Sequence, residues 1–186
     1  MPLPSFPGLE SHPAAARPDL VAPSVAAVLA AHPELTEAMA VVEIDPGLAD
    51  TEALTAAFDL PPRASANCVV VLGVRAGDER IAACVVAADT RADVNNLVRR
   101  TLDVRKCSFL AHDRAVAESG MEYGGITPVG LPDHWRLLVD EALLAEPVVI
   151  IGSGVRRSKL LLPGGDLARI PGAEVVPGLG RPLPAA

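Results

Sequence analysis

The sequence predicts a single α+β domain with a largely antiparallel, curved sheet. Its 186 residues fit the roughly 100–200 residues that are usual for one domain. Half of the residues are hydrophobic, which is enough to bury a core. Short β-branched runs are interleaved with helical patterns but do not alternate regularly with them, and this order argues against a doubly wound parallel fold.

The first third of the chain predicts two helices with a strand between them. Apolar residues recur at helical spacing over residues 24–31, where Ser24 is placed to cap the helix. Residues 40–44 form a short apolar run typical of a strand. A second amphipathic helix is expected to begin after Asp50 or Thr51.

The middle of the chain predicts a hairpin and two more helices. Residues 69–72 and 81–86 are β-branched runs joined by turn residues at 75–78, which is a hairpin signal. Asp93 is placed to cap a third helix, and a fourth short helix is expected after Asp113. Further apolar runs predict strands at residues 137–139, 148–151, 160–162 and 175–176.

Both ends of the chain have the composition of tails. Residues 1–18 contain five prolines and no periodicity, and residues 178–186 are also rich in Gly and Pro. We therefore expect a mobile N-terminal tail over residues 1–18, a single domain over residues 19–177 and a C-terminal tail over residues 178–186.

Composition excludes several classes of function. The net charge of -7 excludes a generally basic nucleic-acid coat, although it allows a local basic patch. Aromatic residues make up only 3% of the chain, which argues against a single-strand binder built on many exposed rings. No apolar run approaches the ~20 residues of a transmembrane helix, and the N-terminus lacks the pattern of a signal peptide. Neither DNA nor a membrane is therefore expected as a partner.

Cysteine, histidine and glycine patterns point away from a metal or nucleotide cofactor. The three cysteines lack metal-ligand spacing and are typical of buried thiols in a reducing compartment, so the cytoplasm is the expected location. No Ser-His-Asp arrangement or metal-binding histidine pattern is present, and both common phosphate-binding glycine motifs are missing. His112 is expected at the surface or at a helix end, and His134 is an alternative pocket residue.

The most informative segment is the glycine loop around Gly124 and Gly125. Two adjacent glycines let the backbone adopt positive φ and approach a ligand closely, and Pro128 stiffens the far side. Such a loop is able to direct backbone N–H groups at an anion or at a developing oxyanion. The alternative is a tight connector between a helix and a strand.

This loop is part of an ordered succession of short motifs. These are residues 91–109, Gly-Gly-Ile-Thr-Pro-Val-Gly at 124–130, Leu-Leu-Val-Asp at 137–140, Val-Ile-Ile-Gly-Ser-Gly at 149–154 and Gly-Asp-Leu-Ala-Arg-Ile at 165–170. The succession resembles the YbaK/EbsC family of aminoacyl-tRNA editing domains over residues 38–177. That family includes Cys-tRNA(Pro) deacylases and the editing insert of bacterial prolyl-tRNA synthetases.

The resemblance implies a fold and an activity. The implied fold is a mixed, mostly antiparallel pseudo-barrel with surrounding helices. The implied activity is hydrolysis of the ester in a mischarged aminoacyl-tRNA, as in the editing of Cys-tRNA(Pro) or Ala-tRNA(Pro), with an aminoacyl-tRNA synthetase as a further candidate partner. No protein nucleophile and no cofactor is implied, because the ribose 2′-hydroxyl or a substrate thiol assists the attack. An ester is already activated, and a single oxyanion donor is typically worth ~10²–10³ in rate.

The resemblance also implies which residues form the site. The loop that holds the aminoacyl end consists of Gly124, Gly125, Ile126, Thr127 and Pro128. The substrate-binding candidates are Asn67, Asp140, Gly152, Ser153, Gly154 and Arg156.

One position departs from the family pattern. Many members carry a lysine on the first long strand that contacts the terminal phosphate, and Asn67 stands there in this chain. An amide donates hydrogen bonds but brings no charge, and charged partners make hydrogen bonds about twice as strong. The nearest cations that could take its place are Arg156, Arg157 and Lys159.

Several assignments keep a simpler structural alternative. Asp140 either positions substrate or caps the segment that follows it. Thr127 either contacts substrate or holds its loop, and Ser153 is more readily explained by a local backbone bond. At the level of the whole protein, the alternatives to a deacylase are a non-catalytic RNA-end-binding or regulatory protein of the same fold, and a small-molecule or protein-interaction module that has lost tRNA.

Overall fold

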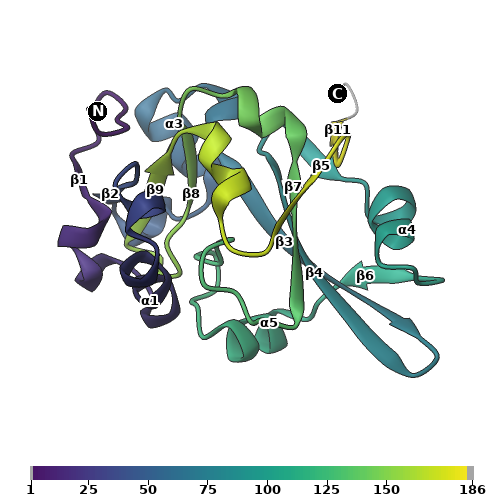
Figure 1. Cartoon of the computed structure of the whole chain (residues 1–186). Coiled ribbons are helices and arrows are strands. Elements are labelled where there is room, and N and C mark those ends of the chain that lie inside the picture. The colour runs from purple at the N-terminus through teal and green to yellow at the C-terminus, as the bar shows by residue number, and fades with distance from the viewer. Residues whose placement is uncertain (1, 184–186) are drawn as a thin grey trace.

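Two sheets organise the chain over residues 2–183, which are the residues described in this computed structural model (Figure 1). The first sheet has the strand order β1-β2-β9-β8 and is antiparallel throughout. The second has the order β10-β7-β4-β3-β6, in which β7 pairs in parallel with both of its neighbours. A short ribbon of β11 and β5 completes the strands of the described part.

The elements have the following bounds. The strands are β1 (Ser11–Pro13), β2 (Ala40–Glu43), β3 (Ala66–Arg75), β4 (Asp78–Ala87), β5 (Thr90–Ala92), β6 (Cys107–Phe109), β7 (Trp135–Asp140), β8 (Val149–Gly152), β9 (Ser158–Leu162), β10 (Ala173–Val176) and β11 (Gly180–Pro182). The helices are α1 (Pro23–Ala31), α2 (Pro33–Thr36), α3 (Thr51–Phe58), α4 (Arg99–Thr101) and α5 (His112–Ser119). Short 3₁₀ turns connect them, and none of the helices within residues 2–183 is long and apolar enough to cross a bilayer.

The predicted α+β class is confirmed, and so is the mostly antiparallel pairing. The two main sheets meet at one parallel bridge, between Ser65 and Ile150, and within residues 2–183 they do not close into a barrel. Every predicted strand is found. The sequence missed the three-residue strands β1, β5, β6 and β11, because runs that short carry no readable periodicity.

The hairpin of β3 and β4 is the central element of the second sheet. Its strands pair along their whole length, and Ala76 and Gly77 turn the chain with φ values of 51° and 91°. The residues of β4 alternate between two cores: Ile81, Ala83 and Val85 contact one, whereas the residues between them contact the other. A strand buried on both faces reads as a continuous apolar run, which explains why this hairpin was visible in the sequence.

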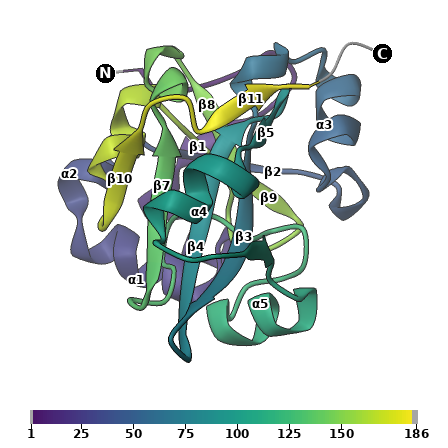
Figure 2. The same cartoon turned by 90° about the vertical axis from the view of Figure 1, so that its right-hand side faces the viewer.

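Helices cover both faces of this sheet. Figure 2 shows α4 lying across β4 and β7, where Val98 and Leu102 belong to the same buried cluster as Cys84 and Leu138. The opposite face packs toward the first sheet and α1, and this larger cluster holds Trp135.

Two predicted helix caps are wrong. Helix α1 begins at Pro23, whose missing N–H suits the first helical position, and the buried hydroxyl of Ser24 has no partner in the described structure. A π-helical turn over Val94–Val98 follows Asp93 before α4 begins. The Asp93 carboxylate accepts hydrogen bonds from the side chains of Asn96 and Arg181 instead of capping the turn.

The parts expected to be tails pack against the domain. Strand β1 pairs with β2, and Leu9 and Ala14 are buried, so the second half of residues 1–18 departs from the expected mobile tail. At the other end, β11 pairs with β5 and Leu179 is completely buried. Such edge strands tolerate proline, and their stability comes from tertiary contacts that composition does not reveal. The last residues of the predicted C-terminal tail, 184–186, lie outside the described part.

The burial of Leu179 gives a direct test of this C-terminal packing. Leu179→Ala should lower the free energy of unfolding by about 2–5 kcal/mol, the usual range for a leucine deleted from a core. Urea unfolding measures the change. The matched control is Leu183→Ala, because Leu183 is 53% exposed and should be near neutral. Equal stability of both variants would mean that the segment is a free tail.

Candidate functional site

A cavity of about 470 Å³ opens beside the N-terminal half of β3. In Figure 2, α3 and α5 flank this strand on one side of the molecule, and residues from both helices contribute to the wall. The lining residues are Ala49, Asp50, Thr51, Ala66, Asn67, Cys68, Val69, Val70, Phe109, Leu110, His112, Ala115, Tyr123, Gly124, Ile126, Gly152 and Lys159.

The cavity follows a gap in the pairing of β3. One edge of β3 pairs with β4 along its length. The other edge contacts β8 at Ser65 and β6 only from Val71 onward, and Leu110 N–H donates to the Val70 carbonyl. The residues between Ser65 and Val70 therefore present a strand edge to the cavity instead of to another strand.

Asn67 lies on this unpaired stretch, where the family resemblance places a lysine. The hydroxyl of Thr51, the first residue of α3, donates to Asn67 Oδ1 at 2.7 Å. This bond fixes the carboxamide and leaves its N–H groups as donors toward the cavity.

The glycine loop is held by the turn that follows β8. Glu122 N–H donates to the Gly154 carbonyl at 2.8 Å, and Gly154 N–H donates back to the Gly125 carbonyl at 2.8 Å. A Cβ on Gly125 would lie 2.9 Å from backbone atoms of Val155, and one on Gly152 would lie 2.5 Å from the Gly125 carbonyl oxygen. The two backbones are thus so close that only glycine fits at these two positions.

Four of the predicted site residues line the cavity: Asn67, Gly124, Ile126 and Gly152. Gly125 lies directly behind them, in contact with the turn after β8.

The other residues of the predicted loop and turn do not line this cavity. Thr127 is completely buried and its hydroxyl has no partner in the described structure, and Pro128 lines a separate small hollow beside Trp135. The Ser153 hydroxyl bonds with that of Ser158 at 2.7 Å, and Gly154 packs against Ala22.

Asp140 also lies away from the cavity. It is 2% exposed at the end of β7, and its carboxylate accepts a hydrogen bond from Gly180 N–H at 3.1 Å. It makes no side-chain cap for the 3₁₀ turn that follows. Neither expected role is seen, and the contact instead anchors β11.

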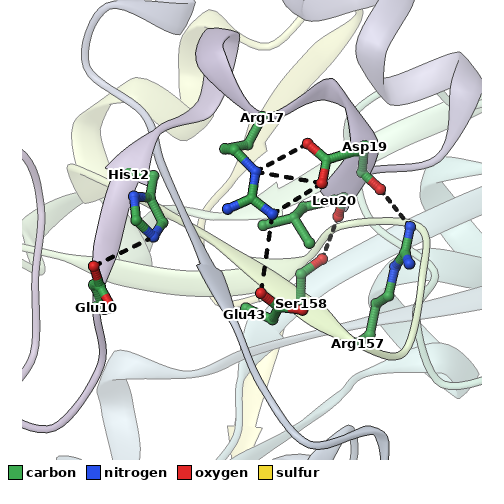
Figure 3. Close-up of polar contacts among 8 residues, drawn as sticks. All are labelled: Glu10, His12, Arg17, Asp19, Leu20, Glu43, Arg157 and Ser158. Carbon is green, nitrogen blue, oxygen red and sulfur yellow. Dashed lines mark hydrogen bonds and ion pairs between the residues drawn. The ribbon is translucent and has the colours of Figure 1, made fainter.

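The three candidate cations go to three different places. Arg156 donates to the carbonyls of Tyr123 at 3.2 Å and Pro46 at 3.1 Å, so it braces the glycine loop from outside. Arg157 points away and donates to the Asp19 carbonyl, beside the ion pair of Arg17 and Asp19 (Figure 3). Only Lys159 of the three lines the cavity, where its ammonium donates to the Ala49 carbonyl at 2.6 Å.

Lys159 is an unusual lysine because only 7% of it is exposed. Burial lowers the pKa of its ammonium to about 8, and the nearby negative charge of Asp50 only partly opposes that shift. The sequence named Lys159 only as one of three cations near the Gly-Ser-Gly turn, and it gave no sign that this residue is buried.

Two exposed aromatic rings stand at the cavity. Phe109 is 68% exposed and Tyr123 is 57% exposed, and the ring of His112 lies 4.8 Å from that of Tyr123. The sequence expected His112 at the surface or at a helix end, and it missed this contribution to the cavity wall. His134 instead contacts Glu118 at 3.2 Å and is not part of the wall.

The cavity offers no activated thiol. Burial raises the pKa of Cys68, which lines the wall, to about 12, so its thiol stays protonated near neutral pH. Burial also raises the pKa of Cys84 and of Cys107. Within residues 2–183 no cluster of three or more potential metal ligands occurs.

Comparison with known proteins assigns the sequence around this cavity to a family. The family model for the aminoacyl-tRNA editing domain matches residues 45–170, a span that contains every residue of the cavity wall. The chain belongs to the aminoacyl-tRNA editing domain family. The resemblance inferred from the glycine loop and its companion motifs is thereby confirmed.

Solved structures of the same fold agree with this assignment. A proposed trans-editing enzyme for prolyl-tRNA synthetase is 21% identical with a TM-score of 0.69, over 84% of this chain and 97% of that one. The hypothetical protein APE2540 is 21% identical with a TM-score of 0.71, over 83% and 99% of the two chains. A scaffold protein designed to carry a grafted epitope is 23% identical with a TM-score of 0.68, over 88% and 100%. At these identities the likeness establishes the fold alone.

The contact between the two glycine segments predicts a specific sensitivity. Gly152→Ala should lower the free energy of unfolding by about 1–3 kcal/mol, because the added methyl overpacks against the Gly125 carbonyl. Gly165→Ala is the matched control, since its nearest contact would be 3.9 Å away. Urea unfolding compares them, and a fully tolerated Gly152→Ala would contradict the close approach.

The depressed pKa of Lys159 predicts how stability depends on pH. In the unfolded chain this lysine titrates near 10.5, so between pH 8 and 10.5 the unfolded state holds a proton that the folded state has released. Wild-type stability should therefore rise with pH in this window by up to about 1.4 kcal/mol per unit, relative to Lys159→Met. Urea unfolding of both proteins from pH 7 to pH 10.5 measures the difference. A constant difference would mean that Lys159 titrates normally.

Proposed function

We propose that the protein is a trans-acting aminoacyl-tRNA deacylase, which hydrolyses the ester of a mischarged tRNA. The observation that carries this proposal is the cavity framed by the glycine loop, in a chain of the editing-domain family. Such a substrate is found where translation takes place, which agrees with the cytoplasmic location expected from the sequence. Cys-tRNA(Pro) and Ala-tRNA(Pro) are the first candidates.

The glycine loop supplies the oxyanion donors in this proposal. Gly124 and Ile126 both line the cavity, and within residues 2–183 their backbone N–H groups donate to no acceptor. Water attacks the carbonyl carbon of the ester and loses a proton. Negative charge develops on the carbonyl oxygen, and these N–H groups stabilise it. The ester bond to the ribose then breaks, the ribose oxygen takes up a proton, and free amino acid and tRNA are released.

This chemistry needs no protein nucleophile. The Cys68 thiol, with its pKa raised to about 12, stays protonated, and the Ser153 hydroxyl is bound within its own turn. The ribose 2′-hydroxyl of the substrate remains as the group that assists the attack. That requirement would also restrict the substrate to RNA.

The exposed rings fit the nucleoside part of the substrate. Bases stack on aromatic side chains, and Phe109 and Tyr123 offer two such surfaces at one cavity in a chain with few aromatics. A second hollow of about 770 Å³ shares Asn67, Val69 and Phe109 with the first and includes Arg91 and Arg181. This hollow continues the route along which the acceptor end of the tRNA would enter.

The second candidate is a non-catalytic RNA-end-binding or regulatory protein of the same fold. Asn67 favours it, because a neutral amide stands where the family pattern has a phosphate-binding lysine. Both candidates require tRNA binding that weakens with salt. They differ in whether any mischarged tRNA is hydrolysed.

A deacylation panel with 3′-labelled Cys-, Ala- and Ser-tRNA(Pro) tests the proposal. We expect release above the spontaneous rate for at least one tRNA. Phe109→Ala should raise KM roughly 5- to 150-fold, because stacking on an aromatic ring is worth ~1–3 kcal/mol per base. Val74→Ala is the control, since Val74 is 50% exposed at the far end of the β3–β4 hairpin. A flat panel with tRNA binding retained would favour the non-catalytic candidate.

A further inference from the structure

The buried ammonium of Lys159 lacks most of its hydrogen-bond partners. An ammonium carries three N–H donors. Within residues 2–183 that of Lys159 makes one hydrogen bond, to the Ala49 carbonyl, and no carboxylate lies within 4.0 Å of it. Buried cations are normally paired, because desolvation of an unpaired charge is strongly unfavourable. The site is therefore short of an anion.

The side chain of Lys159 reaches the cavity from β9, next to the glycine loop. Lys159 pairs with Gly152 across β8 and β9, and directly opposed residues present their side chains to the same face of a sheet. Gly152 has no side chain, and its own face contacts the glycine loop. Lys159 itself lines the cavity, so an anion bound in the cavity, beside the loop that holds the ester in our proposed function, can reach its ammonium.

The charges of the cavity wall match those of an aminoacyl nucleotide. Lys159 is the one Lys or Arg among the lining residues, and Asp50 is the one Asp or Glu. Asp50 Oδ1 lies 3.6 Å from the point where a Cβ on Gly124 would stand, so it is close to the glycine loop. The terminal aminoacyl-adenosine carries a cationic α-ammonium next to the ester and an anionic 5′-phosphate.

We propose that Lys159 binds the 5′-phosphate of the terminal aminoacyl-adenosine, while Asp50 faces its α-ammonium. The inference rests on the proposed function for the identity of the substrate. It assigns the phosphate contact to β9, whereas the family pattern places it on β3, where Asn67 stands. Lys159 and Asp50 both touch substrate in this arrangement, and the amide of Asn67 adds a neutral donor.

Minimal substrates isolate the phosphate contact. The 3′-aminoacyl esters of adenosine and of adenosine 5′-monophosphate differ only in that phosphate. Wild type should prefer the phosphorylated ester roughly 10- to 100-fold in kcat/KM, the usual worth of a hydrogen bond to a charged group. Lys159→Met should abolish this preference, and Lys159→Arg should restore part of it. Lys106→Met is the matched control, because Lys106 is the other lysine of the chain and is exposed.

The same esters test Asp50. N-acetylation removes the α-ammonium, and wild type should lose activity on the acetylated ester, whereas Asp50→Asn should discriminate less between the two forms. The expected loss is only about 2- to 5-fold, because Asp50 is exposed and solvent weakens the pair.

Three results would overturn the assignment. The first is a wild type that does not distinguish the two esters. The second is a Lys159→Met variant that loses activity on both esters equally, which would give Lys159 a structural role. The third is activity confined to esters of aspartate or glutamate, which would mean that the Lys159 ammonium binds the side-chain carboxylate of the amino acid and not the phosphate.

A binding measurement separates this inference from the proposed function. Calorimetry compares adenosine 5′-monophosphate with adenosine, on wild type and on Lys159→Met. Tighter binding of the monophosphate by wild type only supports the phosphate site even if no ester is hydrolysed. Equal affinities in wild type would refute the phosphate site even if the deacylation panel is positive.

Discussion

The close contact between two glycine segments determines the geometry of the whole site. Residues 122–126 and 152–155 approach to distances that a single Cβ would violate, and reciprocal backbone hydrogen bonds join them. The second segment is the turn between β8 and β9, so the first sheet holds it in place. Its hydrogen bonds in turn fix the glycine loop, although that loop has no regular structure of its own. Arg156 adds to it by bonding the Tyr123 carbonyl from outside.

The cavity exists because this contact coincides with a gap in the second sheet. Strand β3 is paired on one edge along its length, but its other edge is free between the bridge at Ser65 and the start of β6. A free strand edge invites pairing with another chain unless it is covered. Here α3, α5 and the glycine loop surround it and leave a cavity of about 470 Å³. The elements that prevent a further strand from adding are also the walls of the site.

The sequence predicted the fold well where burial is continuous and poorly where it is local. The β3–β4 hairpin, β8 and β9 are apolar runs, and they were found. Strands β1 and β11 depend on pairing with strands far away in the chain, so no local sequence pattern predicts them. The site divides in the same way. Glycine signals a close backbone approach, so the loop was found, whereas the burial of Lys159 and the anchoring role of Asp140 follow from tertiary packing alone.

The placement of charge in the cavity has a thermodynamic consequence. A buried lysine without a carboxylate partner destabilises the free protein, and an apolar side chain of the same length would fill that space more favourably. The packing of the fold gives no reason for the charge. In the proposed arrangement the 5′-phosphate of the substrate supplies the missing partner and offsets part of the desolvation penalty. In that arrangement the desolvated ammonium thus favours binding of the substrate's anionic end, and the backbone N–H groups of the glycine loop stabilise the charge that develops on the ester.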